Sequence, residues 1–433
     1  MNDRAEAPTR AASQATGAFA SVTTLFFAWG FITSLIDPLV AAVKGIFSLS
    51  NVEAQLTAFA FFIAYGVVSI PAALLVARLR AVPSIVLAIL LMILACAVIL
   101  GASNLATYEG VLLGLFILAS GITILQVAAN PLAAALGSPE RSHFRLTFSQ
   151  AFNSLGTVLG PLLGAKLLLE RVEVPEGQVI SAADRSAALA SIDLSFLIVA
   201  ALLAFLAAFI WRSRRRIANA APTAVGEAPG FIDTLRQVFS SRWALLGGLA
   251  IFLYVGAEVA IGTQLALFLA DDGVWGIPLQ QAGYFVSLYW LGAMIGRFAG
   301  SALLTRIPAA RLLAVFAVAN ALLCLFVYMT PGAAAGYAAL GIGLFNSIMF
   351  PLIFTLTLER SAASAEATSG FLCTAIIGGA LLPLAAGAVA DASGYAAAFV
   401  VPLACYALLM LFAVAAGRAA PRAAVQGTPA LAH

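Results

Sequence analysis

Histidine is scarce in this chain, because only His143 and His433 occur among its 433 residues. A histidine metal site or histidine-based catalysis therefore has almost no material to work with. The 4 cysteines lie inside apolar runs with no metal or disulfide spacing, so we expect them to be packing residues. No nucleophile with an adjacent base and no phosphate-binding loop occurs, which argues against an enzyme and against a bound cofactor.

Charge is scarce as well. Only 9% of the residues are charged and 63% are hydrophobic, and the mean hydropathy is +1.04. A chain with so little polar surface could not stay soluble, which predicts an all-α integral membrane protein. The net charge of +3 is small and unevenly placed, so it relates to membrane orientation and not to a nucleic-acid partner. The first 18 residues lack the layout of a signal peptide, so we expect the first helix to be retained.

Apolar runs long enough to cross a bilayer as a helix recur along the chain. They predict twelve transmembrane helices, at 19–43, 54–77, 82–101, 109–136, 143–168, 190–211, 243–271, 279–303, 309–329, 333–357, 366–390 and 396–417. With the N-terminus inside, eighteen of the 22 Lys and Arg residues fall in cytoplasmic segments, and only Lys44, Lys166, Arg171 and Arg185 fall outside. We therefore expect a multi-pass protein of the inner membrane with both termini in the cytoplasm.

The longest polar stretch between predicted helices divides the chain into two halves. Residues 212–242 begin with an Arg-rich run and continue through Pro- and Ala-rich sequence, which is typical of a cytoplasmic linker. This places a six-helix bundle at 19–211 and a second one at 243–417. The remaining segments, 1–18 and 418–433, are predicted to be cytoplasmic tails.

The two halves also repeat one another. In the fourth helix Gln126 precedes Pro131 by five residues, and in the tenth helix Asn346 precedes Pro351 by the same interval. Internal duplication of six-helix halves is the layout of the major facilitator fold, whose substrate site lies near the bilayer midplane between the halves. Pro131 also removes a backbone donor, so a carbonyl one turn earlier needs another partner.

Amide side chains interrupt the fourth and fifth helices. Gln126 and Asn130 are four residues apart, and Gln150 and Asn153 are three apart, so each pair shares one helical face. An amide in hydrocarbon loses its hydrogen bonds to water, so both faces should meet a partner helix or a wet cavity. Amides both donate and accept hydrogen bonds, as sugar hydroxyl groups do. We therefore predict a sugar site formed by these four residues and Asn346.

Two carboxylates lie within predicted spans, Asp37 in the first helix and Glu258 in the seventh. An acid at such a depth must be paired, hydrated or protonated. Asp37 is therefore suited to load a proton on one side of the membrane and to release it on the other, unless it is a helix-end acid wetted by the interface or paired with Lys44. Glu258 is predicted to line the cavity as a sugar acceptor or second ion site, the alternative being a buried structural hydrogen bond.

Aromatic rings offer apolar contact to the carbons of a sugar ring. The candidates are Trp29, Tyr254, Tyr289 and Trp290. Anchoring at the membrane interface and packing between helices are the competing roles of Trp and Tyr. Arg297 falls at a predicted cytoplasmic helix end, where we expect contacts with other helices or headgroups and not with substrate.

Two longer motifs carry a resemblance. The run Gln126-Val-Ala-Ala-Asn130-Pro131, followed by Arg145-Leu-Thr-Phe-Ser-Gln-Ala-Phe-Asn-Ser-Leu-Gly156, resembles the signature of the fucose/galactose/glucose symporter family of the major facilitator superfamily. The similarity implies a twelve-helix sugar importer that works by alternating access, with helices one, four, seven and ten lining the cavity.

The resemblance also implies roles for single residues. In the fucose permease branch, an Asp matching Asp37 and a Glu at the position of Gln126 are tied to proton and sugar handling. Only the first is kept here, and Gln126 resembles the glucose/galactose branch. We therefore predict proton-coupled import of a hexose or hexose derivative by a monomer surrounded by membrane lipids. A sodium-coupled symporter, an uncoupled sugar facilitator and an exporter of amphiphilic compounds are the alternatives, and the amide faces argue against the last.

Overall fold

The computed structural model describes residues 3–34, 51–105, 107–164, 182–221 and 229–422. Every regular element within these ranges is a helix. The first half contains α1 (Asp3–Ser34), α3 (Asn51–Leu79), α4 (Ala81–Asn104), α5 (Tyr108–Ala135), η1 (Pro139–Arg141), α6 (Ser142–Gly164) and α7 (Ala182–Ala220). The second half contains α9 (Arg242–Ala270), α10 (Leu279–Leu303), α11 (Ala309–Met329), α12 (Ala333–Asn346), α13 (Met349–Leu358), α14 (Ala365–Thr374), η3 (Ala375–Ile377), α15 (Gly378–Ser393), α16 (Tyr395–Ala398) and α17 (Val400–Arg418).

Within the described ranges, 10 helical segments are long and apolar enough to cross a membrane. The two other expected spans, 143–168 and 279–303, coincide with α6 and α10, which carry more polar side chains. These two helices belong to different halves and pack against each other. Their polar residues can therefore be satisfied by protein, which a lipid-facing helix could not offer.

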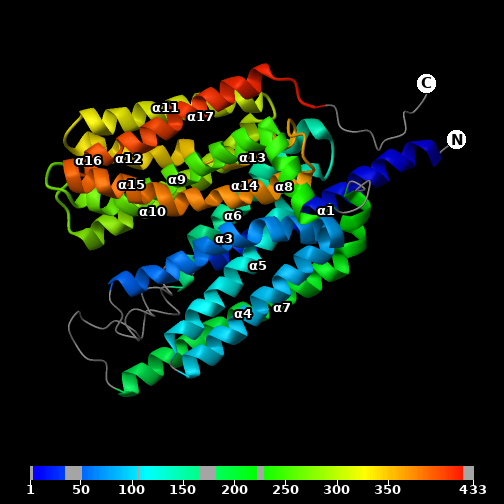
Figure 1. The fold of residues 1–433 in the computed structure, drawn as a ribbon, viewed down its shortest axis with the longest axis horizontal. Helices are drawn as coiled ribbons and strands as arrows, with labels where there is room; N and C mark the ends of the chain where they lie inside the picture. Colours follow the sequence, from blue (N-terminus) through cyan, green and yellow to red (C-terminus); the bar gives the residue numbers. More distant parts are fainter. Residues whose placement is uncertain (1–2, 35–50, 106, 165–181, 222–228, 423–433) are drawn as a thin grey trace.

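The helices form two bundles that meet along a central seam. Figure 1 shows α11 and α17 on one flank and α4 and α7 on the opposite flank, with α3, α6, α10 and α14 between them. The helix α8 (Phe231–Ser240) lies within the stretch expected as a linker, and Gln237 on it accepts a hydrogen bond from the backbone N–H of Ser364 at 3.2 Å. The first residues of α1 and the last of α17 lie at the same end of the molecule as α8 (Figure 1).

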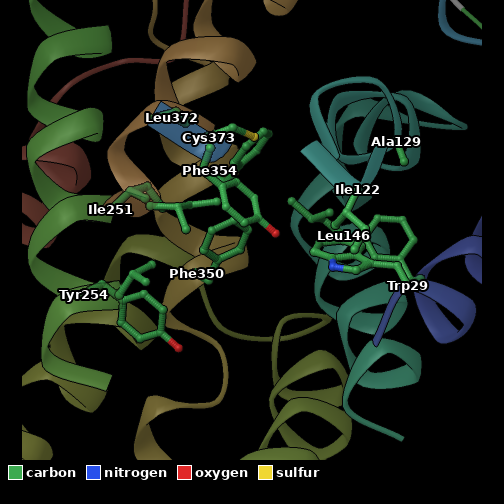
Figure 2. Packing of buried hydrophobic residues seen from close by; sticks show 14 of the residues in the cluster. Trp29, Ile122, Ala129, Leu146, Ile251, Tyr254, Phe350, Phe354, Leu372 and Cys373 are labelled. Atoms are coloured by element: carbon green, nitrogen blue, oxygen red, sulfur yellow. The ribbon is translucent and has the colours of Figure 1, made fainter. Parts of the chain in front are cut away.

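Buried apolar side chains fill both bundles. In Figure 2 they form two groups in the middle of the molecule, with Trp29, Ile122 and Leu146 on the N-terminal side and Ile251 and Tyr254 on the C-terminal side. Glycines also let neighbouring helices, such as α1 and α6, approach each other closely. A Cβ atom on Gly30 of α1 would overlap the carbonyl oxygen of Asn153 on α6, so these two backbones are in direct contact.

The two prolines expected to mark equivalent helices have different local structures. The helix α5 continues unbroken through Pro131. Its counterpart is divided, because α12 ends at Asn346 and α13, which contains Pro351, begins at Met349. The repeat in the sequence thus corresponds to a continuous helix in one bundle and to an interrupted one in the other.

Candidate substrate cavity between the bundles

A cavity of about 220 Å³ lies between the two bundles. Helices of both halves supply its walls, and the lining residues are Trp29, Phe62, Tyr65, Gln126, Gln150, Asn153, Val255, Glu258, Arg297, Phe350 and Ile376. The N-terminal wall contributes neutral amides and aromatic rings. The C-terminal wall contributes the two charged side chains of the lining, together with apolar ones.

Three amides form the polar part of the N-terminal wall. Gln126 on α5 donates through Nε2 to the hydroxyl of Tyr65 on α3 at 2.6 Å. Gln150 on α6 donates through Nε2 to Oδ1 of Asn130 at 3.3 Å, and Asn153 donates through Nδ2 to a carbonyl oxygen of α1 at 3.1 Å. Within the described part of the chain, the carbonyl oxygens of these three amides accept no hydrogen bond. An amide oxygen in a cavity lining can accept a hydrogen bond from a ligand hydroxyl group.

Glu258 and Arg297 form the polar part of the C-terminal wall. Oε1 of Glu258 on α9 accepts a hydrogen bond from the hydroxyl of Tyr254 at 2.7 Å. The same oxygen lies 4.0 Å from Nη2 of Arg297 on α10. Both side chains are mostly buried, with 13% of the Glu258 and 12% of the Arg297 side chain exposed. A buried ion pair of this kind places a strong donor and a strong acceptor side by side in the cavity wall.

Asn346 lies behind this wall and is completely buried. Its Nδ2 donates to the hydroxyl of Tyr289 at 2.6 Å. Its Oδ1 accepts hydrogen bonds from Nδ2 of Asn320 at 2.8 Å and from the hydroxyl of Tyr406 at 2.7 Å. The amide is thus engaged at both ends, and it joins α10, α11, α12 and α17 inside one bundle.

The prolines explain two further contacts around the cavity. A proline has no N–H, so the carbonyl four residues earlier loses its helical donor. In α5 that carbonyl belongs to Val127, and its oxygen accepts a hydrogen bond at 2.9 Å from the hydroxyl of Ser369 on α14, in the opposite bundle. In the second half it belongs to Ser347, and its oxygen accepts a hydrogen bond at 2.8 Å from Nε of Arg297, in the same bundle.

Half of the ten predicted substrate contacts line the cavity. These are Trp29, Gln126, Gln150, Asn153 and Glu258. They were identifiable because a Trp, an amide or a carboxylate inside an apolar helix needs a polar partner or a wet surface. Asp37, the predicted coupling acid, lies outside the described residues.

The other predicted contacts do not line this cavity. Tyr254, Tyr289 and Asn346 are fully buried in the network behind the C-terminal wall, and Asn130 is fully buried beneath Gln150. Trp290 is 38% exposed and packs against the ring of Tyr289, with ring centroids 5.1 Å apart. Their positions differ from the prediction because helical periodicity gives a residue's face but not which neighbouring side chains cover it.

Six of the lining residues were not predicted from the sequence. They are Phe62, Tyr65, Val255, Arg297, Phe350 and Ile376. Tyr65 carried a usable signal, since a hydroxyl within an apolar run normally finds a hydrogen-bond partner when buried. Arg297 was expected to contact other helices or headgroups at a helix end. The structure shows contacts with other helices and also places the residue in the cavity wall.

Comparison with known proteins identifies the family. The chain matches the Major Facilitator Superfamily profile over residues 18–372. The chain belongs to this superfamily. It is 40% identical over 396 residues to the glucose/galactose transporter of Brucella abortus, covering 91% of this chain and 93% of that protein. It is 30% identical over 410 residues to the L-fucose-proton symporter of Escherichia coli, covering 91% of this chain and 92% of that protein.

A comparison with solved structures supports the same family. A major facilitator transporter, FucP, in the outward conformation superimposes with a TM-score of 0.80 at 29% identity, covering 93% of this chain and 99% of that chain. The predicted fucose/galactose/glucose symporter family and the predicted all-α membrane fold of two six-helix bundles are therefore confirmed. The relatives are transporters, so the prediction that the chain is not an enzyme is also confirmed.

In this major facilitator protein, a further polar contact joins the bundles at the end where α8 lies. Oε1 of Glu359, just after α13, accepts a hydrogen bond from Ser142 at 2.9 Å and lies 3.1 Å from Nε2 of His143. Nδ1 of His143 lies 2.6 Å from Oγ1 of Thr355. That hydroxyl also lies within hydrogen-bond distance of a carbonyl oxygen of α13, at 2.7 Å. His143 on α6 therefore contacts both Glu359 and Thr355 of the opposite bundle.

The surroundings of Glu359 shift its acidity. Burial raises the pKa of this carboxyl, but the hydrogen bonds from His143 and Ser142 and the positive charges of His143 and Arg360 outweigh that effect. The pKa of Glu359 therefore lies below its usual value. The contact between the bundles thus favours an ionised carboxylate at Glu359.

Proposed function

We propose that this protein imports a hexose or hexose derivative across the inner membrane by cation symport and alternating access. The observation that carries the proposal is a small cavity between two bundles, with three amides on one wall and an acid–arginine pair on the other. Sugar hydroxyl groups both donate and accept hydrogen bonds, so they match amides, a carboxylate and a guanidinium together. The buried Trp29 ring beside these groups suits the apolar face of a sugar ring.

The size of the cavity supports a monosaccharide over an amphiphile. Its volume of about 220 Å³ is below the ~300–1,000 Å³ of pockets that hold drug-sized ligands. The relatives support the same substrate class, since two of them are named glucose/galactose transporter and L-fucose-proton symporter. Within the cavity we assign hydrogen bonding of sugar hydroxyl groups to Gln126, Gln150, Asn153 and Glu258.

We assign proton coupling to Asp37, with sodium coupling as the competing scheme. Gln126 cannot titrate, so coupling by an acid at that position is not available to this chain. The test is uphill uptake of sugar into proteoliposomes by the wild type and by Asp37→Asn. Loss of gradient-driven accumulation with counterflow retained is the expected result, and full accumulation by the variant would remove Asp37 from this role. Replacing sodium by choline at fixed pH separates the two ions.

The substrate itself is tested by binding. Purified protein is titrated calorimetrically with D-glucose, D-galactose, L-fucose, D-mannose and N-acetylglucosamine. We expect saturable binding of at least one of them. The absence of binding for every member of the panel, with a folded protein, would contradict the sugar assignment. Counterflow without uphill uptake would instead identify an uncoupled facilitator.

The orientation follows from the distribution of charge. We place both termini and α8 in the cytoplasm, because most Lys and Arg residues of the chain then lie on the cytoplasmic side. The contact of His143 with Glu359 would then close the cytoplasmic side of the cavity. Protease accessibility of either terminus in inverted membrane vesicles tests this orientation.

A further inference from the structure

Arg297 occupies a position that connects both bundles with the cavity. Its Nε donates to the carbonyl oxygen of Ser347 at 2.8 Å, which ties it to its own bundle. Its Nη1 donates to Oγ of Ser154 on α6, in the opposite bundle. Its Nη2 lies 4.0 Å from Oε1 of Glu258. One planar guanidinium therefore contacts the backbone carbonyl freed by a proline, a hydroxyl across the seam and the carboxylate of the cavity.

Local sequence accounts for this placement. A Cβ atom on Gly296 would overlap the carbonyl oxygen of Leu344, and one on Gly343 would overlap that of Tyr289, so α10 and α12 are in backbone contact. This contact brings Arg297 beside the interruption between α12 and α13, where the carbonyl needs a donor. The guanidinium is thereby fixed in direction, and its remaining N–H groups point toward the seam and the cavity.

No direct hydrogen bond joins the charged pair, so a hydroxyl group can bridge it from the cavity side. A separation of 4.0 Å exceeds the ~3.2 Å limit of a good N–H···O hydrogen bond, so Nη2 and Oε1 attract each other without a direct hydrogen bond. A hydroxyl group can accept from the guanidinium and donate to the carboxylate at once. In a mostly buried site such charge-assisted hydrogen bonds are stronger than neutral ones.

We propose that Arg297 binds a substrate hydroxyl together with Glu258 and relays this binding to the seam through Ser154. The bond from Nη1 to Ser154 holds α10 against α6. A hydroxyl bound between the two charged groups draws the guanidinium toward the ligand and weakens the bond to Ser154, which loosens the two bundles. This inference rests on the proposed function, since the ligand is a sugar of the binding panel.

The experiment combines sugar binding with a distance measurement. Spin labels are attached at Leu105→Cys, after α4, and at Met329→Cys, at the end of α11. These side chains are 76% and 70% exposed and lie in different bundles. The native cysteines among the described residues are all buried, so labelling is selective. Distances between the labels are measured with and without saturating D-glucose, D-galactose or L-fucose, and affinities are measured by calorimetry.

The wild type should bind a sugar and change its label distances. For Arg297→Gln we expect affinity to fall by more than about tenfold, because Glu258 loses its buried charge partner. Arg297→Lys keeps the charge and should remain folded, but a lysine cannot reach three partners with one planar group, so the distance change should be lost. Ser154→Ala should broaden the distances before any sugar is added. Arg306→Gln, at an exposed position in the turn that follows α10, is the matched control and should behave as the wild type.

The outcomes separate the two proposals. If the wild type binds none of the sugars, the proposed function fails and this inference fails with it. If the wild type binds and the Arg297→Lys and Ser154→Ala variants show wild-type affinity and wild-type distance changes, only the role of Arg297 is overturned. If Arg297→Gln does not fold, the Glu258→Gln/Arg297→Gln pair should fold better, since neither charge is left unpaired. Equal instability of the pair and the single variant would also overturn the role of the charges.

Discussion

Both bundles contain an amide–tyrosine hydrogen bond next to a proline, but the two amides lie in different surroundings. In each, an amide five residues before a proline donates to a tyrosine hydroxyl at 2.6 Å, from Gln126 to Tyr65 and from Asn346 to Tyr289. Gln126 also lines the cavity, whereas Asn346 is sealed by two further donors. The duplicated sequence therefore determines the amide–tyrosine bond, and the surrounding helices determine whether that amide can meet a ligand.

The two bundles also differ in how they satisfy the backbone carbonyl that each proline leaves without a helical donor. The one freed by Pro131 receives its hydrogen bond from the opposite bundle, and the one freed by Pro351 receives it from its own bundle. A bond across the seam has to break when the bundles move apart, whereas a bond within one bundle need not. The carbonyl freed in the N-terminal half thus depends on the opposite bundle, whereas the one freed in the C-terminal half is satisfied within its own bundle.

The largest expected effect is the loss of stability when Asn346 is replaced. Asn346→Ala would leave the three side chains bonded to it without their partner. An unsatisfied buried polar group costs ~1–3 kcal/mol, so we expect a loss of at least about 3 kcal/mol of stability. Thermal melting in detergent measures it. A variant that melts like the wild type but no longer binds sugar would reverse the roles assigned here.

Replacing Gln126, the matching amide of the N-terminal bundle, should mainly weaken sugar binding. Gln126→Ala removes a cavity amide and the hydrogen bond that it donates to the Tyr65 hydroxyl. We expect the sugar affinity to weaken by roughly 1–3 kcal/mol, with a smaller loss of stability than for Asn346→Ala. Calorimetric titration gives the affinity. An unchanged dissociation constant would take Gln126 out of the site.

The sequence predicted the membrane fold and much of one wall of the cavity. The fold follows from apolar runs of spanning length, and the N-terminal wall follows from amides at helical spacing. The role of Asn346 could not be deduced, because its partners Asn320 and Tyr406 come from helices whose rotation the sequence does not give. Arg297 was assigned to a helix end because linear position does not reveal that the interruption after α12 draws the guanidinium inward.

The contact between the bundles at the α8 end should depend on pH. Because the pKa of Glu359 is lowered, its stabilising effect is full above the usual glutamate pKa and is lost as the pH falls through the lowered value. Glu359→Gln should cost about 1 kcal/mol above the usual glutamate pKa. Melting of the wild type and the variant across pH measures this difference, which should shrink at acidic pH; a constant difference would speak against an ionised carboxylate.

The smallest effects should come from the two tyrosines. Tyr65→Phe and Tyr289→Phe each remove the hydroxyl that accepts from an amide, at a cost of ~0.5–1.5 kcal/mol. We expect the change at Tyr65 to appear mainly in sugar affinity and the change at Tyr289 mainly in the melting temperature. Measuring both quantities for both variants tests the assignment, and identical profiles would remove the distinction between the bundles.

The most direct test asks whether one ligand contacts both walls. Calorimetric titration of a hexose is compared among the wild type, Gln126→Ala and Glu258→Gln, which lie on opposite sides of the cavity. The account predicts that the wild type binds and that each substitution weakens binding of the same sugar. Wild-type affinity in both folded variants would show that the ligand does not occupy the space between the amides and the charged pair.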